Sequence, residues 1–232
     1  MRNLFLTPSL VNLSVVLRGL AGGVSRLALA AFLIPGVAGA ATLTFDDIST
    51  GAFGIGPITN PYGGLNLSCG GVSACDAVNT VTYSFNPSGY QSAASSGTNV
   101  LSTAYDAGPD SLSFAPSGGG TFVFNSVQLT GAWRDGLSIA VEGFNGITSV
   151  DSAMFVLGNA GSRMLATFNW SNLTSVTITA SGGTPGHFTL PTPYELAVDD
   201  LTYGASPVPL PAAGWLLLSG LLGIGARARR AA

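Results

Sequence analysis

The chain alternates apolar and polar residues in short runs separated by turn-forming residues. In "TVTYSF", for example, Val81, Tyr83 and Phe85 fall on one side, because successive side chains of an extended strand point to opposite faces. Clusters such as "NPSGY" and "SGGTPG" separate the runs. Residues 42–203 contain no segment with a 3.6-residue apolar period. We therefore predict an all-β fold of about ten short strands, arranged as an antiparallel two-sheet sandwich of the jelly-roll kind.

One run shifts its alternation part-way along. In "TFVFNSVQLT", Phe122 and Phe124 share a face, and Val127 and Leu129 resume the pattern one residue out of step. An extra residue in one strand of a pair produces such a shift. We therefore expect a β-bulge at Asn125–Ser126.

Charge is scarce and unevenly distributed. Only 8% of the 232 residues are charged, against about a quarter in ordinary soluble domains. There is no lysine, and all eleven acidic residues lie between Asp46 and Asp200, where the only basic residues are Arg134 and Arg163. The formal charge of that part is 2 − 11 = −9. Nucleic acid is excluded as a partner because it requires a basic surface, whereas divalent cations and neutral polymers are compatible with this charge.

The first forty residues have the features of an export signal. The apolar run "LALAAFLI" follows three arginines and ends at Pro35, and "AGA" then supplies the small residues of a cleavage site before Ala41. We expect a signal peptide helix at residues 1–40 and a mature domain at residues 41–206. The alternative is an N-terminal helix that belongs to the fold.

Export bears on the two cysteines. Cys69 and Cys75 are the only pair in the chain and enclose "GGVSA". In an oxidising compartment we expect them to form a disulfide that closes a small loop. With a single histidine, they are too few for a closed four-ligand zinc site unless carboxylates complete it.

The last 26 residues, 207–232, combine a proline motif, an apolar segment and an arginine cluster. A helix is expected after Pro211, and residues 212–226 contain no charge. Fifteen helical residues span roughly 22 Å, less than the ~30 Å hydrocarbon core of a bilayer. We therefore expect a short transmembrane helix with a cytoplasmic basic end. The alternative, a buried core helix, would not ordinarily end in arginines.

The tail "VPLPAAGWLLLSGLLGIGARARR" resembles a PEP-CTERM sorting signal in its VPLPA variant. Leu210 stands where the glutamate that gives the motif its name would be. The resemblance implies processing by an exosortase, a membrane protease-transpeptidase, near the proline motif. It also implies export in a Gram-negative bacterium through an inner-membrane intermediate to the cell surface or extracellular matrix, in association with exopolysaccharide. The matching residues are Val208, Pro209, Leu210, Pro211, Ala212, Arg227, Arg229 and Arg230.

The body of the chain resembles the jelly-roll domain often found ahead of such tails. The similarity lies in "FDDI…PYGGLNLS", "LTGAWRDGLSIAVEGF", "FNWSNLTSVTITASGGT" and "AVDDLTY", in that order. It supports the fold and implies no particular activity.

Two aspartate pairs flank the domain and predict a calcium site. "FDD" (Asp46, Asp47) leaves the first strand, and "VDD" (Asp199, Asp200) lies in the last. Terminal strands of sandwiches often pair, which would gather four mutually repelling carboxylates that a hard cation would neutralise. We expect one carboxylate of each pair to bind a structural calcium ion, with backbone carbonyls and Glu195 completing the shell. The alternative is that these aspartates cap strand ends in solvent.

"GAWRDG" suggests a carbohydrate-binding platform. An exposed Trp133 would stack on a pyranose ring while Arg134 and Asp135 bind hydroxyl groups. Three further aromatic residues in Gly/Ser/Asn-rich loops are candidates to join it: Tyr62, Tyr90 and Tyr105. The alternative is a hairpin in which Trp133 packs on the sheet edge and the two charged residues lie in the turn.

Catalysis has little support. His187 is the only histidine and lies beside a Gly-Pro turn, and the mature domain has no GxSxG motif. A glycosidase needs only two carboxyl groups, but no pair is singled out. We therefore expect a non-enzymatic protein of the cell surface or exopolysaccharide matrix with a structural or adhesive role. The alternative is a carbohydrate-binding module for the co-exported polysaccharide.

Overall fold

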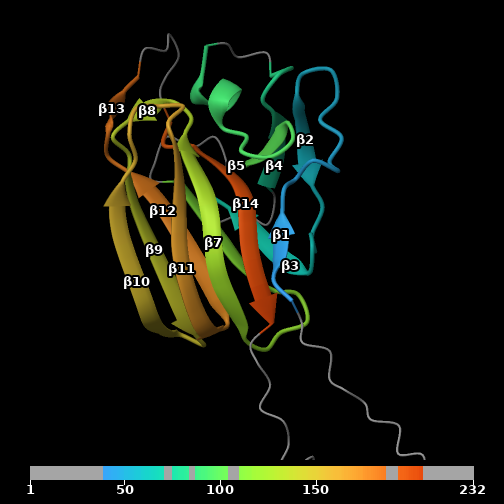
Figure 1. Cartoon of the computed structure of the whole chain (residues 1–232), viewed down its shortest axis with the longest axis vertical. Helices are drawn as coiled ribbons and strands as arrows, with labels where there is room; N and C mark the ends of the chain where they lie inside the picture. The colour runs from blue at the N-terminus through green and yellow to red at the C-terminus, as the bar shows by residue number, and fades with distance from the viewer. Residues whose placement is uncertain (1–38, 71–74, 84–86, 104–109, 187–192, 206–232) are drawn as a thin grey trace, which may run out of the picture. The chain divides into compact units, whose positions relative to one another are not determined.

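The computed structural model describes residues 39–70, 75–83, 87–103, 110–186 and 193–205. They form a β-sandwich of antiparallel strands (Figure 1). In spatial order, the seven-stranded sheet contains β11 (Arg163–Leu173), β7 (Phe122–Gly131), β14 (Leu196–Ala205), β5 (Asn99–Ser102), β4 (Cys75–Asn79) and β2 (Ile55–Ile58), with β1 (Ala41–Leu43) also paired to β14. The five-stranded sheet contains β10 (Thr148–Val156), β9 (Ser138–Asn145), β12 (Ser175–Ser181), β6 (Asp110–Pro116) and β3 (Leu65–Cys69). A small sheet pairs β13 (Thr184–Pro185) with β8 (Arg134–Asp135), and one 3₁₀ turn, η2, spans Gly89–Ser92.

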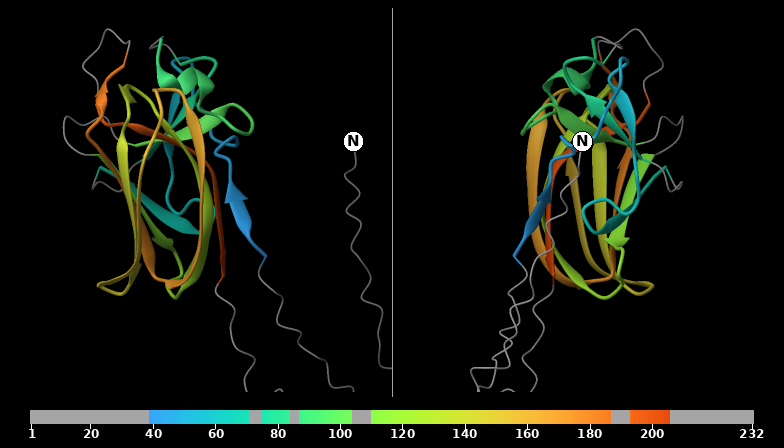
Figure 2. Two further views of the ribbon diagram at one scale, coloured as in Figure 1. Left: turned by 60° about the vertical axis from the view of Figure 1, so that its left-hand side comes forward. Right: turned by 90° about the vertical axis from the view of Figure 1, so that its right-hand side faces the viewer.

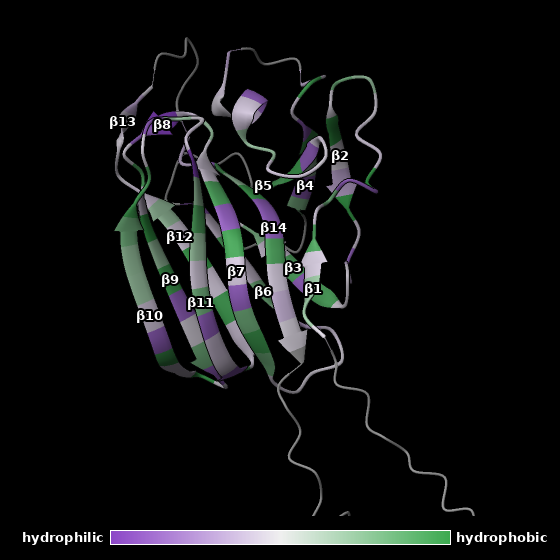
Figure 3. Cartoon of the chain, in the orientation of Figure 1, coloured by the Kyte–Doolittle hydropathy of each residue, from purple (hydrophilic) through white to green (hydrophobic). Residues whose placement is uncertain are grey.

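The main core lies between the two large sheets and follows from the period-two pattern. Alternate residues of β6 and β12 are buried, including Leu112, Phe114 and Ile178. Apolar and polar bands also alternate along β7 and β14 in Figure 3. The antiparallel two-sheet sandwich expected from the sequence is thus confirmed.

The predicted bulge in β7 is also confirmed. Phe124 pairs with Tyr203 of β14, whereas Ser126, two residues further on, pairs with Thr202, so one extra residue lies in β7. Burial changes phase at that point, because Asn125 and Ser126 are both half-buried between the buried residues Phe124 and Val127. The bulge lets one strand keep apolar residues in the core on both sides of the shift.

A second apolar cluster covers one end of the outer face of the seven-stranded sheet. Its strand residues, Val78, Val100 and Ala197, pack with the aromatic side chains of Tyr90 and Trp133. β5 is consequently buried along its whole length. Aromatic residues that the sequence places in loops are therefore part of a core here.

The first and last described strands are neighbours, as expected. β1 pairs with β14 in the register Ala41↔Tyr203 to Leu43↔Leu201, and the blue strand runs beside the red one in the left view of Figure 2.

The expected disulfide is present: Cys69 at the end of β3 is bonded to Cys75 at the start of β4, with Cα atoms 5.2 Å apart. It therefore joins the five-stranded sheet to the seven-stranded sheet.

Several sequence expectations fall on residues outside the described ranges. These are the signal peptide up to residue 38, the sorting tail from residue 206, Tyr105 and His187. Within the described part of the chain, no helix is long and apolar enough to cross a membrane.

Candidate functional site

The structure corrects the prediction of a sugar-stacking Trp133. Its side chain is only 3% exposed, and its indole Nε1 donates a hydrogen bond to Oε2 of Glu195. Arg134 donates to the carbonyl oxygens of Gly182 and Gly183, at 2.8 Å each. Asp135 accepts a hydrogen bond from the backbone N–H of Ala160 at 2.7 Å. These three residues hold strands and loops together instead of forming an exposed platform. The hairpin alternative does not describe them either, because Arg134 and Asp135 form β8, which pairs with β13, and Trp133 lies in a buried cluster.

Trp133 is buried because its polar atom has a partner in the interior. Glu195 is 4% exposed, and its Oε2 also accepts from the hydroxyl of Tyr90 at 3.2 Å. Burial raises the pKa of Glu195 to about 7, although both hydrogen bonds act in the opposite direction. The charge of Asp110 adds to the increase. This inaccessible polar cluster has a structural role.

The structure also corrects the calcium prediction. No group of three or more His, Cys, Asp or Glu side chains within the described ranges is arranged to hold a metal ion. Oδ2 of Asp199 accepts hydrogen bonds from the backbone N–H groups of Ser95 and Ser96, at 2.7 and 3.0 Å. Asp200 accepts from the hydroxyl groups of the same two serines. Hydrogen-bond donors of the protein therefore offset the repulsion expected between these carboxylates.

Asp46 accepts hydrogen bonds from the second half of the loop formed by residues 95–99, whose first half binds Asp199 and Asp200. Its Oδ1 accepts from the backbone N–H groups of Thr98 and Asn99, at 2.8 and 3.0 Å. Between the two halves lies Gly97, with a positive φ of 51°. Because the amides on both sides of this glycine point at carboxylates, residues 95–99 link the segment that follows β1 to β14.

The aspartates that follow β1 also line an open hollow, which we call the Tyr62 hollow. Its volume is about 450 Å³, within the roughly 300–1,000 Å³ range of small-molecule sites. It combines one aromatic ring with carboxyl and hydroxyl groups. Its lining residues are Thr42, Leu43, Thr44, Asp46, Asp47, Tyr62 and Gly63. Tyr62 is one of the aromatic residues that the sequence suggests for sugar binding. In the structure it lines the same hollow as Asp46 and Asp47, two of the predicted calcium ligands.

A tight turn positions Tyr62. Tyr62 and Leu65 exchange backbone hydrogen bonds of 2.8 and 2.9 Å across Gly63 and Gly64, which both have positive φ. Two such residues form a type I′ turn, for which glycine is favoured. A Cβ atom at Gly63 would collide with the Leu43 side chain, so glycine also allows the turn to approach β1.

Phe45 supports the ring and directs the aspartates outward. Its fully buried ring stacks on that of Tyr62, with centroids 5.4 Å apart and planes 18° from parallel. Phe45 has a φ of 61°, a region that bulky residues rarely adopt. Strained conformations of this kind cluster at functional sites and also occur in turns. Here the chain turns directly after β1, so that Phe45 enters the core while Asp46 and Asp47 are exposed.

Tyr62 and Asp47 form the polar part of the hollow. The Tyr62 hydroxyl donates to Oδ1 of Asp47 at 2.6 Å. Burial, followed by this hydrogen bond and the Asp47 charge, raises the pKa of Tyr62 well above its ordinary value, so the hydroxyl remains a donor. Considering the described residues alone, Oδ2 of Asp46 and Oδ2 of Asp47 accept no hydrogen bond. The hollow therefore offers carboxylate acceptors beside a half-buried aromatic ring.

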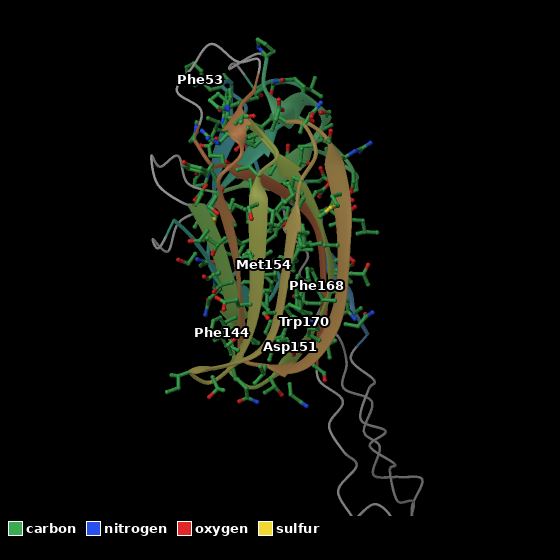
Figure 4. The ribbon with its side chains drawn as sticks, turned by 90° about the vertical axis from the view of Figure 1, so that its left-hand side faces the viewer. Phe53, Phe144, Asp151, Met154, Phe168 and Trp170 are labelled. Atoms are coloured by element: carbon green, nitrogen blue, oxygen red, sulfur yellow. A yellow bond between two sulfur atoms is a disulfide. The ribbon has the colours of Figure 1, made fainter. Side chains whose placement is uncertain are left out.

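A second half-buried aromatic pair, not singled out from the sequence, lies on β11. The ring centroids of Phe168 and Trp170 are 4.7 Å apart, and Phe168 stacks on the core residue Phe124. Trp170 also lies over Gly143 of the opposite sheet, where a Cβ atom would be 3.2 Å from its ring. These residues fill the gap between the sheets at their β10–β11 side (Figure 4).

No family model matches the chain, and no curated protein matches it. Among solved structures, the chain is similar to a DUF4465 family protein from Bacteroides caccae, with 13% identity, a TM-score of 0.47, and coverage of 71% of this chain and 98% of that one. It is also similar to the family 32 CBM of C. perfringens NanJ in complex with galactose, with 16% identity, a TM-score of 0.36, and coverage of 64% and 98%. A third similar structure is the K2 cleaved adhesin domain of Lys-gingipain, with 12% identity, a TM-score of 0.37, and coverage of 71% and 97%.

Proposed function

We propose that this protein is an exported, non-catalytic jelly-roll domain that binds carbohydrate in the Tyr62 hollow. The observation that carries the proposal is the half-exposed ring of Tyr62 beside the exposed carboxylates of Asp46 and Asp47. This combination favours the carbohydrate-binding alternative over a purely structural or adhesive role.

The chemistry of the hollow suits a sugar. An aromatic ring offers an apolar surface to the C–H face of a pyranose, while its hydroxyl hydrogen-bonds at the edge. The carboxylates accept hydrogen bonds from sugar hydroxyl groups, and bonds to a charged acceptor are stronger than neutral ones. Thr42 and Thr44 add hydroxyl groups along the wall. The existing bonds to Asp46 and Asp47 fix the site before a ligand arrives, which lowers the entropic cost of binding.

Charge restricts the class of carbohydrate. Residues 46–200 carry a formal charge of −9, and two of the carboxylates line the hollow. A polyuronate or a sulfated glycan would be repelled by this field. The ligand we infer is therefore a neutral polysaccharide.

Affinity electrophoresis tests the proposal. Gels containing neutral glucans or galactans should retard the wild-type protein, whereas gels containing alginate should not. Tyr62→Ala should weaken retardation by about tenfold in apparent Kd, because it removes the stacking surface. Asp47→Asn should weaken it less, since the amide oxygen still accepts a hydrogen bond.

Two matched variants serve as controls. Phe53→Ala removes an aromatic side chain that is 74% exposed and lies outside the hollow. Asp151→Asn makes the same carboxyl-to-amide change on β10. Both should migrate as the wild type does. Mobility that is unchanged in every neutral gel would favour the structural role instead.

We also propose that residues 207–232 direct sorting through an exosortase, as the PEP-CTERM resemblance implies. The proline motif and arginine cluster around a short apolar segment support this proposal. Replacing Pro209 and Pro211 by alanine should leave an unprocessed precursor in the membrane. Mass spectrometry of the mature protein from its native host would contradict sorting by cleavage if the chain still ended at Ala232.

A further inference from the structure

The outer face of the five-stranded sheet is rich in hydroxyl groups. Alternate residues of its strands, such as Ile139 and Val141 of β9, are buried in the core, so the residues between them point to the opposite face. We call this surface the hydroxyl face. Its serine and threonine residues are Ser68, Ser111, Ser113, Ser138, Ser149, Ser152, Ser175, Thr177, Thr179 and Ser181.

Strand register arranges these residues in rows across the sheet. One row runs from Ser152 through Glu142, Thr177 and Ser113 to Ser68. The hydroxyl groups of Ser113 and Thr177 are 3.0 Å apart and hydrogen-bond each other.

A neighbouring row runs from Met154 through Ala140 and Thr179 to Ser111. Rows of outward residues are separated by roughly 7 Å along the strands, and strands by about 4.8 Å. The result is a regular grid of short side chains that both donate and accept hydrogen bonds.

Charge is almost absent from this face. Glu142 is the single ionisable residue in the rows described above, although residues 46–200 carry eleven acidic groups. Apolar side chains border the grid on the β9–β10 side. Met154 and Val156 are 77% and 63% exposed, and the half-buried Phe144 lies near the end of β9 (Figure 4). The face therefore offers hydroxyl groups next to an apolar margin.

We propose that the hydroxyl face is a second carbohydrate-binding surface, which binds an extended neutral polysaccharide chain. Every sugar unit of such a chain carries hydroxyl groups that both donate and accept, and it has C–H faces that pack against apolar side chains. A neutral chain avoids repulsion by the acidic domain, which a polyanion does not. The surface is built by β3, β6, β9, β10 and β12, whereas the Tyr62 hollow is built by β1 and the Tyr62 turn. This inference shares the ligand class of the proposed function but not its site.

Isosteric variants test the surface without large effects on folding. Thr177→Val and Thr179→Val together remove two hydroxyl groups while retaining β-branched side chains, which suit strands. Thr167→Val on β11, an exposed residue of the other sheet, is the matched control. Melting temperatures of all variants establish that each is folded.

Binding is measured with two ligands, a long neutral polysaccharide in affinity gels and a tri- or tetrasaccharide of the same sugar by calorimetry. The Thr177→Val/Thr179→Val variant should bind the polymer about tenfold more weakly, as expected for two lost hydrogen bonds, and bind the short ligand as the wild type does. Tyr62→Ala should lose affinity for the short ligand.

Polymer binding that is equal in the double variant, the control and the wild type would overturn the second surface alone. A loss of polymer binding in the double variant, with short-ligand binding insensitive to Tyr62→Ala, would overturn the hollow alone. A wild-type protein that binds no neutral glycan would overturn both.

Discussion

Replacement of buried Glu195 by glutamine should change how stability depends on pH. In the folded protein, burial raises the pKa of Glu195 to about 7, against an ordinary value of 4.5. The folded state therefore favours the protonated acid more than the unfolded state does. The free energy of unfolding contributed by this group is fully present below about pH 4.5, falls as the pH rises to about 7, and is constant above that.

The size of this loss follows from the pKa difference. A difference of about 2.5 pH units at 1.36 kcal/mol per unit is about 3 kcal/mol. In a domain of this size, that corresponds to roughly 6–12 °C in melting temperature. Glutamine does not ionise, and its amide oxygen still accepts a hydrogen bond from Trp133. The difference in unfolding free energy between Glu195→Gln and wild type should therefore shift by about 3 kcal/mol in favour of the variant between pH 4 and pH 8.

Urea denaturation followed by tryptophan fluorescence at pH 4, 5, 6, 7 and 8 measures this difference directly. Comparing the variant with wild type at each pH cancels the titration of the groups that both proteins share. Glu142→Gln, at the only other glutamate in the chain, makes the same chemical change on the exposed part of β9 and serves as control. A difference between Glu195→Gln and wild type that stays constant from pH 4 to pH 8 would refute the reasoning.

Two further predictions concern the links between distant parts of the sandwich. Replacing Cys69 and Cys75 by alanine should lower the free energy of unfolding by about 2 kcal/mol, the loop-entropy value for so small a ring. Urea titration under non-reducing conditions measures this loss, and two alkylatable thiols in the native protein would show that the bond does not form. Gly97→Ala should cost roughly 2 kcal/mol or more, since its φ is 51° and its Cβ would collide with the Asp46 carboxylate. Gly118→Ala, whose Cβ would meet no atom within 4 Å, is the control, and equal melting temperatures for the two variants would contradict this account of the loop.

The sandwich can be predicted from the sequence because the pattern that indicates each strand lies within that strand. Strand β7 carries its alternation and its bulge in ten consecutive residues, so both can be identified without any knowledge of partners. β10 gives a weaker signal because it lies at a sheet edge, where the apolar side chains of Val150, Met154 and Val156 are exposed and break the pattern.

The candidate sites were harder to predict because they depend on partners far away in the chain. Trp133 has the local context of an exposed turn, and the distant Glu195 provides an acceptor for its indole N–H in the interior. The strands beside the two aspartate pairs, β1 and β14, were correctly expected to be neighbours, but the hydrogen bonds that residues 95–99 donate to Asp46, Asp199 and Asp200 could not be predicted. The local sequence of residues 95–99 does not indicate that they bind these carboxylates.

Tyr62 is a residue of the candidate site that local sequence could not single out. The sequence offered it as one aromatic residue among several, and its neighbours Gly63 and Gly64 predict a turn. Its position beside Asp47 depends on the left-handed backbone of Phe45, which no sequence pattern indicates. The hollow could therefore be described only from the structure.

The most direct test of carbohydrate binding in the Tyr62 hollow is to map the site by NMR. The isotope-labelled protein would be titrated with a short neutral oligosaccharide, and backbone amide shifts would be followed residue by residue. The account predicts that the largest shift changes cluster at residues 42–47 and 62–64, and that Tyr62→Ala abolishes them at the same ligand concentration. Shift changes that cluster elsewhere on the domain, or that persist in Tyr62→Ala, would contradict it.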